Sequence, residues 1–134
     1  MSALPIRTQS EKQMLDITAE VQKILQQEAW EAGILTLFVA HTTAAITINE
    51  NADRDVQHDM LAHLQVLVPR EKEFLHAEGN SDAHIMLSLL GSSEQIIVED
   101  SQLQLGTWQG IYFCEFDGPR NRKVYLQFCN TVSG

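Results

Sequence analysis

Apolar residues recur at three- and four-residue intervals over residues 18–30 and again over residues 53–68, and this spacing predicts two helices that each bury one face. Thr18 is a suitable N-cap for the first helix, and Gly33 lies where this helix should end. Pro69 is expected to end the second helix, because proline cannot continue the helical hydrogen-bond pattern. The side chains expected to face the core are Val21, Ile24 and Leu25 in the first helix and Val56, Met60, Leu64 and Leu67 in the second.

Other parts of the chain carry the shorter apolar runs that are typical of strands. Residues 34–40 are nearly all apolar and too few for a helix, so we expect a strand that is buried on both faces. Residues 45–49 are rich in β-branched side chains and are expected to form a second strand. The residues between them, His41, Thr42 and Thr43, lie either in a hairpin or at a strand bend. Further strands are expected over residues 4–9, 95–98, 102–105, 108–116 and 122–128, and a short third helix over residues 81–90, closed by Gly91.

The order of these elements predicts the fold class. Strands outnumber helices, and the helices lie between strands, which indicates an α+β domain with a mixed or antiparallel sheet, or a β-sandwich, and two to three helices. A turn over residues 117–121 is expected to pair Phe116 with Arg122 in a hairpin. In that register Cys114 and Cys129 lie apart, so we expect both to be small buried apolar residues and not a redox pair.

Composition narrows the possible functions. The chain is 44% hydrophobic and 20% charged, as in an ordinary globular protein, so residues 1–134 are expected to form a single soluble domain. Nine Lys and Arg against eighteen Asp and Glu give a net charge of −9, which argues against a nucleic-acid-binding or membrane-binding face. The first residues lack the apolar run of a signal peptide, and no stretch approaches a membrane span. We therefore expect a cytoplasmic protein without nucleic-acid or membrane partners.

The densest group of chemically active side chains lies in residues 76–84, HAEGNSDAH. Two imidazoles, two carboxylates and an amide fall within this segment, and they are the donors that hold divalent metals in proteins. Gly79 permits the sharp bend that would bring them together. The spacing is not an established zinc signature. The alternative is that residues 80–82 only cap the following helix and that His76 and His84 lie on the surface.

A second group lies where the two central strands end. His41 follows a buried apolar strand, a position where ligands and general bases are common, and the two threonine hydroxyls after it can bind a phosphate or a metal-bound water. The alternative is a histidine that only bonds to backbone beside threonines that favour strands. Glu50, at the end of the next strand, can serve as acid, base or metal ligand. Asn51 or Asp53 is explained equally well as a helix N-cap.

A third group is basic. Three of the nine Lys and Arg residues lie in residues 120–123, and in so acidic a chain a local basic spot favours a small anion over a polyanion. Arg120 can bind a phosphate through two N–H groups, or it can lie at a solvated turn. Trp108 is either a core residue or a stacking wall for a planar ligand.

These stretches together resemble one known family. Residues 41–51 (HTTAAITINEN), 76–84 (HAEGNSDAH), 88–93 (SLLGSS), 105–111 (LGTWQGI) and 115–120 (EFDGPR) are similar, in this order, to the motifs of the YjbQ family. This family is also named the secondary thiamine-phosphate synthase family. The similarity extends over nearly the whole chain.

The resemblance implies a fold and an activity. Members of the family are α+β domains on a β-sandwich-like sheet, and they associate as trimers with clefts between subunits. Positions like His41, His76, Asp82 and His84 line a small pocket that takes a metal or an anion. A weak thiamine-phosphate synthase activity is attached to the family, in which a hydroxymethylpyrimidine diphosphate is joined to a thiazole phosphate with loss of pyrophosphate.

The residues and the resemblance together leave three hypotheses. The chain is an enzyme for a small phosphorylated substrate, a non-catalytic homotrimer that binds a metal or small anion, or an oligomer in which the histidines only pack at interfaces. Histidine ligation would favour zinc or another transition metal over magnesium. The candidate catalytic residues are His41, Glu50, Asp82 and Arg120; the candidate substrate-binding residues are Thr42, Thr43, Asn51, Glu78, Asn80, Ser88, Trp108 and Gln109; the candidate metal ligands are His41, His76 and His84.

Overall fold

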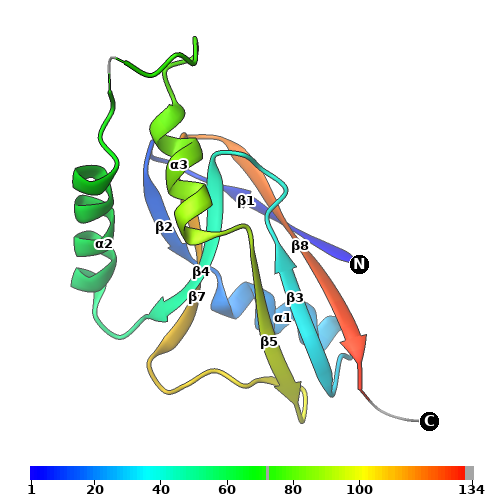
Figure 1. Ribbon diagram of the computed structural model, residues 1–134. Coiled ribbons are helices and arrows are strands. Elements are labelled where there is room, and N and C mark those ends of the chain that lie inside the picture. The colour runs from blue at the N-terminus through cyan, green and yellow to red at the C-terminus, as the bar shows by residue number, and fades with distance from the viewer. Residues whose placement is uncertain (72, 132–134) are drawn as a thin grey trace.

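The structure is a computed structural model of the chain that describes residues 1–71 and 73–131, and these residues form eight strands and three helices (Figure 1). The strands are β1 (Ser2–Arg7), β2 (Gln13–Asp16), β3 (Gly33–Phe38), β4 (Ala44–Glu50), β5 (Ser93–Glu99), β6 (Gln102–Leu103), β7 (Gln109–Glu115) and β8 (Asn121–Asn130). The helices are α1 (Thr18–Gln27), α2 (Arg54–Leu67) and α3 (Ser81–Leu90). None of the helices in the described residues is long and apolar enough to cross a membrane.

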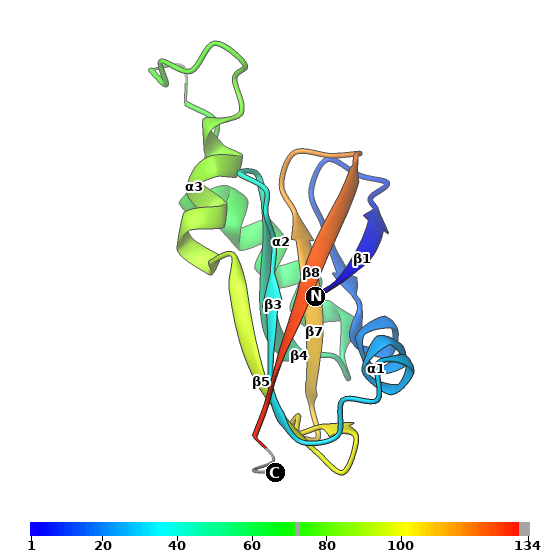
Figure 2. The same cartoon turned by 90° about the vertical axis from the view of Figure 1, so that its right-hand side faces the viewer.

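The strands form two antiparallel sheets that enclose the main core (Figure 2). Five strands lie in the order β1-β8-β3-β5-β6, and three lie in the order β2-β7-β4. Each ladder in the described chain is antiparallel. The fully buried members of the core include Leu35 and Leu37 from β3, Ile46 from β4, Phe113 from β7, Leu126 from β8 and Leu25 from α1. The predicted α+β class, with sheets arranged as a sandwich, is confirmed.

A second, smaller core lies between the three-stranded sheet and the helices α2 and α3. Strand side chains alternate between two faces, so Ile111 and Phe113 of β7 enter the main core while Tyr112 and Cys114 face the other way. There they pack with residues of α3 that include Met86. Burial on both faces explains why β7 is almost continuously apolar.

The predicted hairpin over residues 117–121 is wrong, because β7 and β8 lie in different sheets. β7 pairs with β2 and β4, and β8 pairs with β1 and β3. The chain changes sheet in the same way between β3 and β4, so residues 41–43 form a bend between sheets and not a hairpin. Two such crossings place residues 41–43 and 117–122 at the same end of the sandwich (Figure 1).

The separation of the two cysteines is confirmed, although the hairpin on which it rested is not. Both are free, Cys114 buried and Cys129 exposed, so the predicted burial is wrong for Cys129. Burial raises the pKa of the Cys114 thiol to about 12.

The N-cap of α1 and the burial of α2 differ from the prediction, and one short strand was missed. Ile17, not Thr18, is the N-cap of α1, and the Thr18 hydroxyl instead donates to Asp16 Oδ1 at 2.6 Å. Asp53 does cap α2, since its carboxylate accepts the Asp55 N–H at 2.9 Å. The apolar stripe of α2 reaches the second core only in part: Leu64 packs against it, but the helix has no fully buried residue, and Leu67 is 63% exposed. The short strand β2 was missed because Gln13–Asp16 gives too few residues for an alternation signal.

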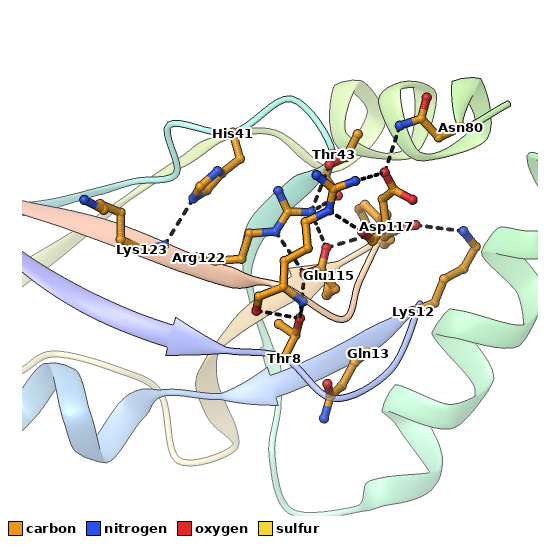
Figure 3. A network of polar contacts seen from close by, with 12 residues as sticks. Thr8, Lys12, Gln13, His41, Thr43, Asn80, Glu115, Asp117, Arg122 and Lys123 are labelled. Carbon is orange, nitrogen blue, oxygen red and sulfur yellow. Dashed lines mark hydrogen bonds and ion pairs between the residues drawn. The ribbon is translucent and has the colours of Figure 1, made fainter. Parts of the chain in front are cut away.

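A buried ion pair joins the strand ends at the crossings (Figure 3). The side chains of Glu115 and Arg122 are 0% and 4% exposed. Arg122 Nε donates to Glu115 Oε1 at 2.9 Å, and Nη2 donates to Glu115 Oε2 and, at 2.9 Å, to Thr43 Oγ1. Thr8 Oγ1 donates to Glu115 Oε1 at 2.7 Å. Burial opposes ionisation of Glu115, but the hydrogen bonds from Arg122 and Thr8 outweigh it and hold the pKa of this carboxyl below its usual range.

We expect Glu115→Gln to lower the free energy of unfolding by about 3–5 kcal/mol, because it leaves the Arg122 charge buried without a counter-ion. The matched double variant Glu115→Leu/Arg122→Met removes both charges and is expected to recover most of this loss. Urea unfolding at pH 7.5 measures both effects.

The same pair predicts the acid response. The folded-state pKa of Glu115 is lowered, so its stabilising contribution is complete above the ordinary carboxyl pKa of about 4.3 and is lost as the pH falls through the lower folded value. If Glu115→Gln lowers the free energy of unfolding by less than about 1 kcal/mol, the size seen for exposed ion pairs, the buried pair is not the stabilising contact described here.

Candidate functional site

A cavity of about 460 Å³ lies beside the two crossings, at one end of the sandwich. Four segments form its walls: the bend after β3, the loop before α3, the first turn of α3, and the connection from β7 into β8. Its lining is dominated by polar side chains, namely His41, Thr42, Thr43, His76, Glu78, Asn80, His84, Arg120 and Arg122. The structure therefore brings together most of the candidate residues from three separate motifs.

His41 is held at the rim of this cavity by the backbone of β8 (Figure 3). Its Nε2 atom accepts a hydrogen bond from the Lys123 N–H at 3.1 Å, so in the neutral ring the proton is on Nδ1. Burial, and then the positive charge of Arg122, lower the pKa of His41 below its ordinary value of 6.5. Near neutral pH His41 is therefore an uncharged ring that can donate one hydrogen bond from Nδ1.

His76 and His84 form a pair that also lines the cavity. Their ring centroids are 5.3 Å apart and the rings are nearly perpendicular, at 87°. His84 lies in the first turn of α3, and His76 lies in the preceding loop. Between them Gly79 has φ +73, the left-handed region that glycine adopts without strain, which lets the loop turn back toward the helix.

Arg120 is positioned by Asp117 and Asn80. Arg120 Nε donates to the Asp117 carbonyl at 2.7 Å, and Nη2 donates to Asp117 Oδ2 at 2.5 Å. Asn80 Nδ2 donates to the same Oδ2 at 2.8 Å. Asn80 is the N-cap residue of α3 but makes no side-chain cap bond, so its amide serves this network and not the helix end. Asp117 thus links the loop before α3 to the guanidinium group.

Arg122 and Glu115 are parts of the site that the sequence analysis missed. Arg122 lines the cavity floor while its guanidinium stays bonded to Glu115 and Thr43. A signal was present: Arg122 alternates with Val124 and Leu126, so all three point to the same side of β8, which is the core side. A charged residue at a core-facing strand position is unusual and indicates a functional or structural role. The spacing of residues within motifs does not detect it.

Asp82 lies outside the cavity, although its motif neighbours line it. Its carboxylate accepts a bond from Lys12 Nζ at 3.0 Å, with Arg70 Nε at 3.6 Å, and lines a different hollow with these two residues. Burial opposes its ionisation, but the Lys12 hydrogen bond and the charges of Lys12 and Arg70 together lower the pKa of Asp82. Residues two apart on a helix point in different directions, which explains how His84 and Asp82 separate.

Four further candidates lie at the far end of the three-stranded sheet. Glu50 is paired in register with Gln109, and the Asn51 N–H donates to the Trp108 carbonyl at 2.9 Å. β4 runs from Ala44 to Glu50, and at about 3.4 Å per residue it separates this group from the cavity by roughly 20 Å. Glu50, Asn51, Trp108 and Gln109 therefore cannot contact a small ligand bound near His41.

The described residues do not form a ready metal centre. Among them, no three His, Cys, Asp or Glu side chains are grouped closely enough to hold a metal ion. In addition, the Nε2 atom of His41 already accepts a hydrogen bond from the Lys123 N–H. Metal binding by His41, His76 and His84 stays a prediction.

Comparison with known proteins gives a consistent result. A family model described as UPF0047 protein YjbQ-like matches residues 2–131. The UPF0047 protein YugU of Bacillus subtilis is 49% identical over 95% of this chain and 97% of its own length. A UPF0047 protein of Methanocaldococcus jannaschii is 48% identical over 91% of this chain and 88% of its own.

Solved structures agree in fold. An uncharacterised conserved protein of the YjbQ/UPF0047 family from Clostridium acetobutylicum has a TM-score of 0.93 at 49% identity, covering 96% of this chain and 100% of that one. A YbjQ-like protein of unknown function from Sulfolobus solfataricus has a TM-score of 0.91 at 30% identity, covering 96% and 95% of the two chains. The family expected from the motifs is confirmed: the chain belongs to the YjbQ-like UPF0047 family.

Proposed function

We propose that the chain binds the phosphate or diphosphate group of a small molecule in the cavity beside His41. One observation carries this proposal: two guanidinium groups and three imidazoles converge there in a chain whose net charge is −9. Such N–H groups are the usual donors to phosphate oxygens. Arg122 also holds the strand ends together through Glu115, but Arg120 and the imidazoles add N–H donors around it that this ion pair does not need.

The two arginines act as oriented donors and not as a large positive field. Glu115 neutralises Arg122, and Asp117 neutralises Arg120. In its hydrogen bonds within the described chain Arg120 uses Nε and Nη2, so its Nη1 group is available to a ligand. A site of this kind suits a small anion that fits the donors, and it offers little to an extended polyanion.

The activity implied by the family resemblance is the finer part of this proposal. In that reaction the carbon–oxygen bond to the diphosphate breaks, and pyrophosphate leaves with the electron pair. A new bond forms between the methylene carbon and the thiazole nitrogen. Negative charge grows on the departing pyrophosphate, and donors placed at this charge lower the barrier. Arg120 and the Nδ1–H of His41 would serve as these donors, and the step needs no nucleophile from the protein.

A non-catalytic binding role is the second candidate. The state of His41 is compatible with it: a neutral ring whose Nε2 accepts the Lys123 N–H is not placed to act as a general base, and the same N–H donors serve binding alone. A turnover assay with the pyrimidine diphosphate and the thiazole phosphate separates the two candidates.

We expect Arg120→Ala to raise the dissociation constant of inorganic pyrophosphate about tenfold or more, since a charge-assisted donor is lost. Arg54→Ala removes the same charge from the exposed start of α2, outside the cavity, and is the matched control with an expected change below about twofold. Isothermal titration calorimetry measures both, and thiamine phosphate formation by the same variants tests turnover.

Equal weakening by both variants would mean that pyrophosphate responds only to overall charge, and no binding to the wild-type chain would remove the proposal. Pyrophosphate binding without thiamine phosphate formation would leave the binding role and remove the transferase.

His41 gives a pH-dependent prediction. We expect its proton on Nδ1 at pH 7.5 and an apparent pKa below 6.5. Because the folded state binds this second proton less tightly than the unfolded chain, the contribution of His41 to stability is full above about pH 6.5 and declines as the pH falls below it. Imidazole ¹⁵N NMR through this range reads the tautomer and the pKa directly. A proton on Nε2, or a pKa above 6.5, would contradict the described hydrogen bond.

We also propose that the chain assembles as a homotrimer, as the resemblance implies. The helices α2 and α3 support an interface, since Leu67 and Leu89 are each 63% exposed and Val66 is 69% exposed. Met60, Leu64 and Leu67 border an apolar hollow of about 360 Å³ there. Soluble proteins seldom leave such a face uncovered.

The double variant Leu67→Glu/Leu89→Glu is expected to reduce the mass in light scattering to one third of the wild-type value, because it places charges in an apolar contact. Ile97→Glu, at an exposed site on β5, is the control and should keep the wild-type mass. A monomeric wild-type chain would overturn the trimer, and a trimeric double variant would exclude this face.

A further inference from the structure

A second cavity adjoins the one beside His41. Its volume is about 570 Å³, and it shares Ala40, His41 and Thr42 with the polar cavity. On its far side the walls are apolar, formed by Phe38 and Leu87 together with the backbone around Gly91. The bend after β3 therefore lies between a polar compartment and a more apolar one, and its residues line both.

Helix α3 runs along both compartments. His84 lines the polar cavity, while Leu87 and Ser88, three and four residues later, line the apolar one. Residues at this spacing share a helix face, so one face of α3 forms a wall that changes from polar to apolar along its length. The Val39 N–H donates to the Ser92 carbonyl at 2.8 Å, which fixes the end of β3 against the segment that follows α3. This wall and the bend after β3 thus fix the position of the two compartments relative to each other.

Phe38 is the side chain best placed to hold a ligand in the apolar compartment. It is the last residue of β3 and is 44% exposed, although Leu37 beside it is fully buried. An aromatic ring half open to a cavity offers a flat surface for stacking. Ser88, a candidate from the sequence, lies in this compartment and not in the polar one; its hydroxyl donates to the His84 carbonyl at 3.0 Å.

We propose that the two cavities form one composite site for a small molecule in which a phosphate or diphosphate is attached to a flat apolar group. The phosphate lies among Arg120 and the imidazoles, and the flat group lies between Phe38 and Leu87. His41 and Thr42 lie at the junction of the two parts. This inference rests on the proposed phosphate binding and adds to it the apolar compartment that receives the flat group and a residue that selects it.

The test compares methyl phosphate with phenyl phosphate by isothermal titration calorimetry on the full chain. The two probes carry the same charge, so their difference isolates the contribution of the ring. We expect phenyl phosphate to bind the wild type about tenfold more tightly, from the apolar surface that it buries. Phe38→Ala should abolish most of this advantage and leave methyl phosphate binding within about twofold. Ile97→Ala trims another exposed apolar residue outside both cavities and should change neither.

The outcomes separate this inference from the proposed function. If neither phosphate binds, phosphate recognition itself fails. If both bind equally, or if Phe38→Ala leaves the advantage of phenyl phosphate intact, only the composite site is overturned. Arg120→Ala provides the internal check, since it should weaken both probes by similar factors.

Discussion

The Glu115–Arg122 ion pair is the constraint on which the candidate site depends. Two buried charges are tolerated only when each is paired and hydrogen-bonded, and here Thr8, Thr43 and the Asp117 N–H provide the remaining bonds. These partners come from the ends of different strands, so satisfying the pair brings those ends to one point. Arg122 is thereby fixed in the cavity floor with its geometry set before any ligand arrives, which is what an anion site requires.

The strand crossings supply the rest of the site. At each crossing the chain leaves one sheet and enters the other, so its polar groups cannot all be used in a ladder. Backbone bonds close the gap: the Phe116 N–H donates to the Thr43 carbonyl at 3.1 Å, and the Thr8 N–H donates to the Arg120 carbonyl at 3.0 Å. Several side chains of the crossing segments, among them His41, Thr42 and Arg120, line the cavity. The site thus lies where the strands of the sandwich end and regular backbone pairing between strands stops.

Much of the fold, but only part of the site, could be predicted from the sequence. Apolar periodicity located most helices and strands, because it reports which face of each element is buried. It could not assign β7 and β8 to different sheets, because the apolar pattern of a buried strand is the same whichever sheet the strand joins. Motif spacing gave separate groups, and the family resemblance placed His41, His76 and His84 in one pocket, as the structure does; it also placed Asp82 there, which instead pairs with Lys12. The candidate list further included Asn51 and Trp108, which the length of β4 separates from the cavity.

The neutralisation of both arginines determines what kind of anion this acidic chain could admit. A bare positive cluster would attract any anion, and it would attract nucleic acid most strongly because that interaction grows with the number of phosphates. Pairing Arg120 with Asp117 and Arg122 with Glu115 removes that general attraction but keeps N–H groups at fixed positions. The overall charge of −9 then repels polyanions beyond the reach of those groups. Ligand selectivity at such a site depends on shape more than on charge. Which molecule binds is then decided by the group attached to the phosphate and by how well that group fits the adjoining compartment.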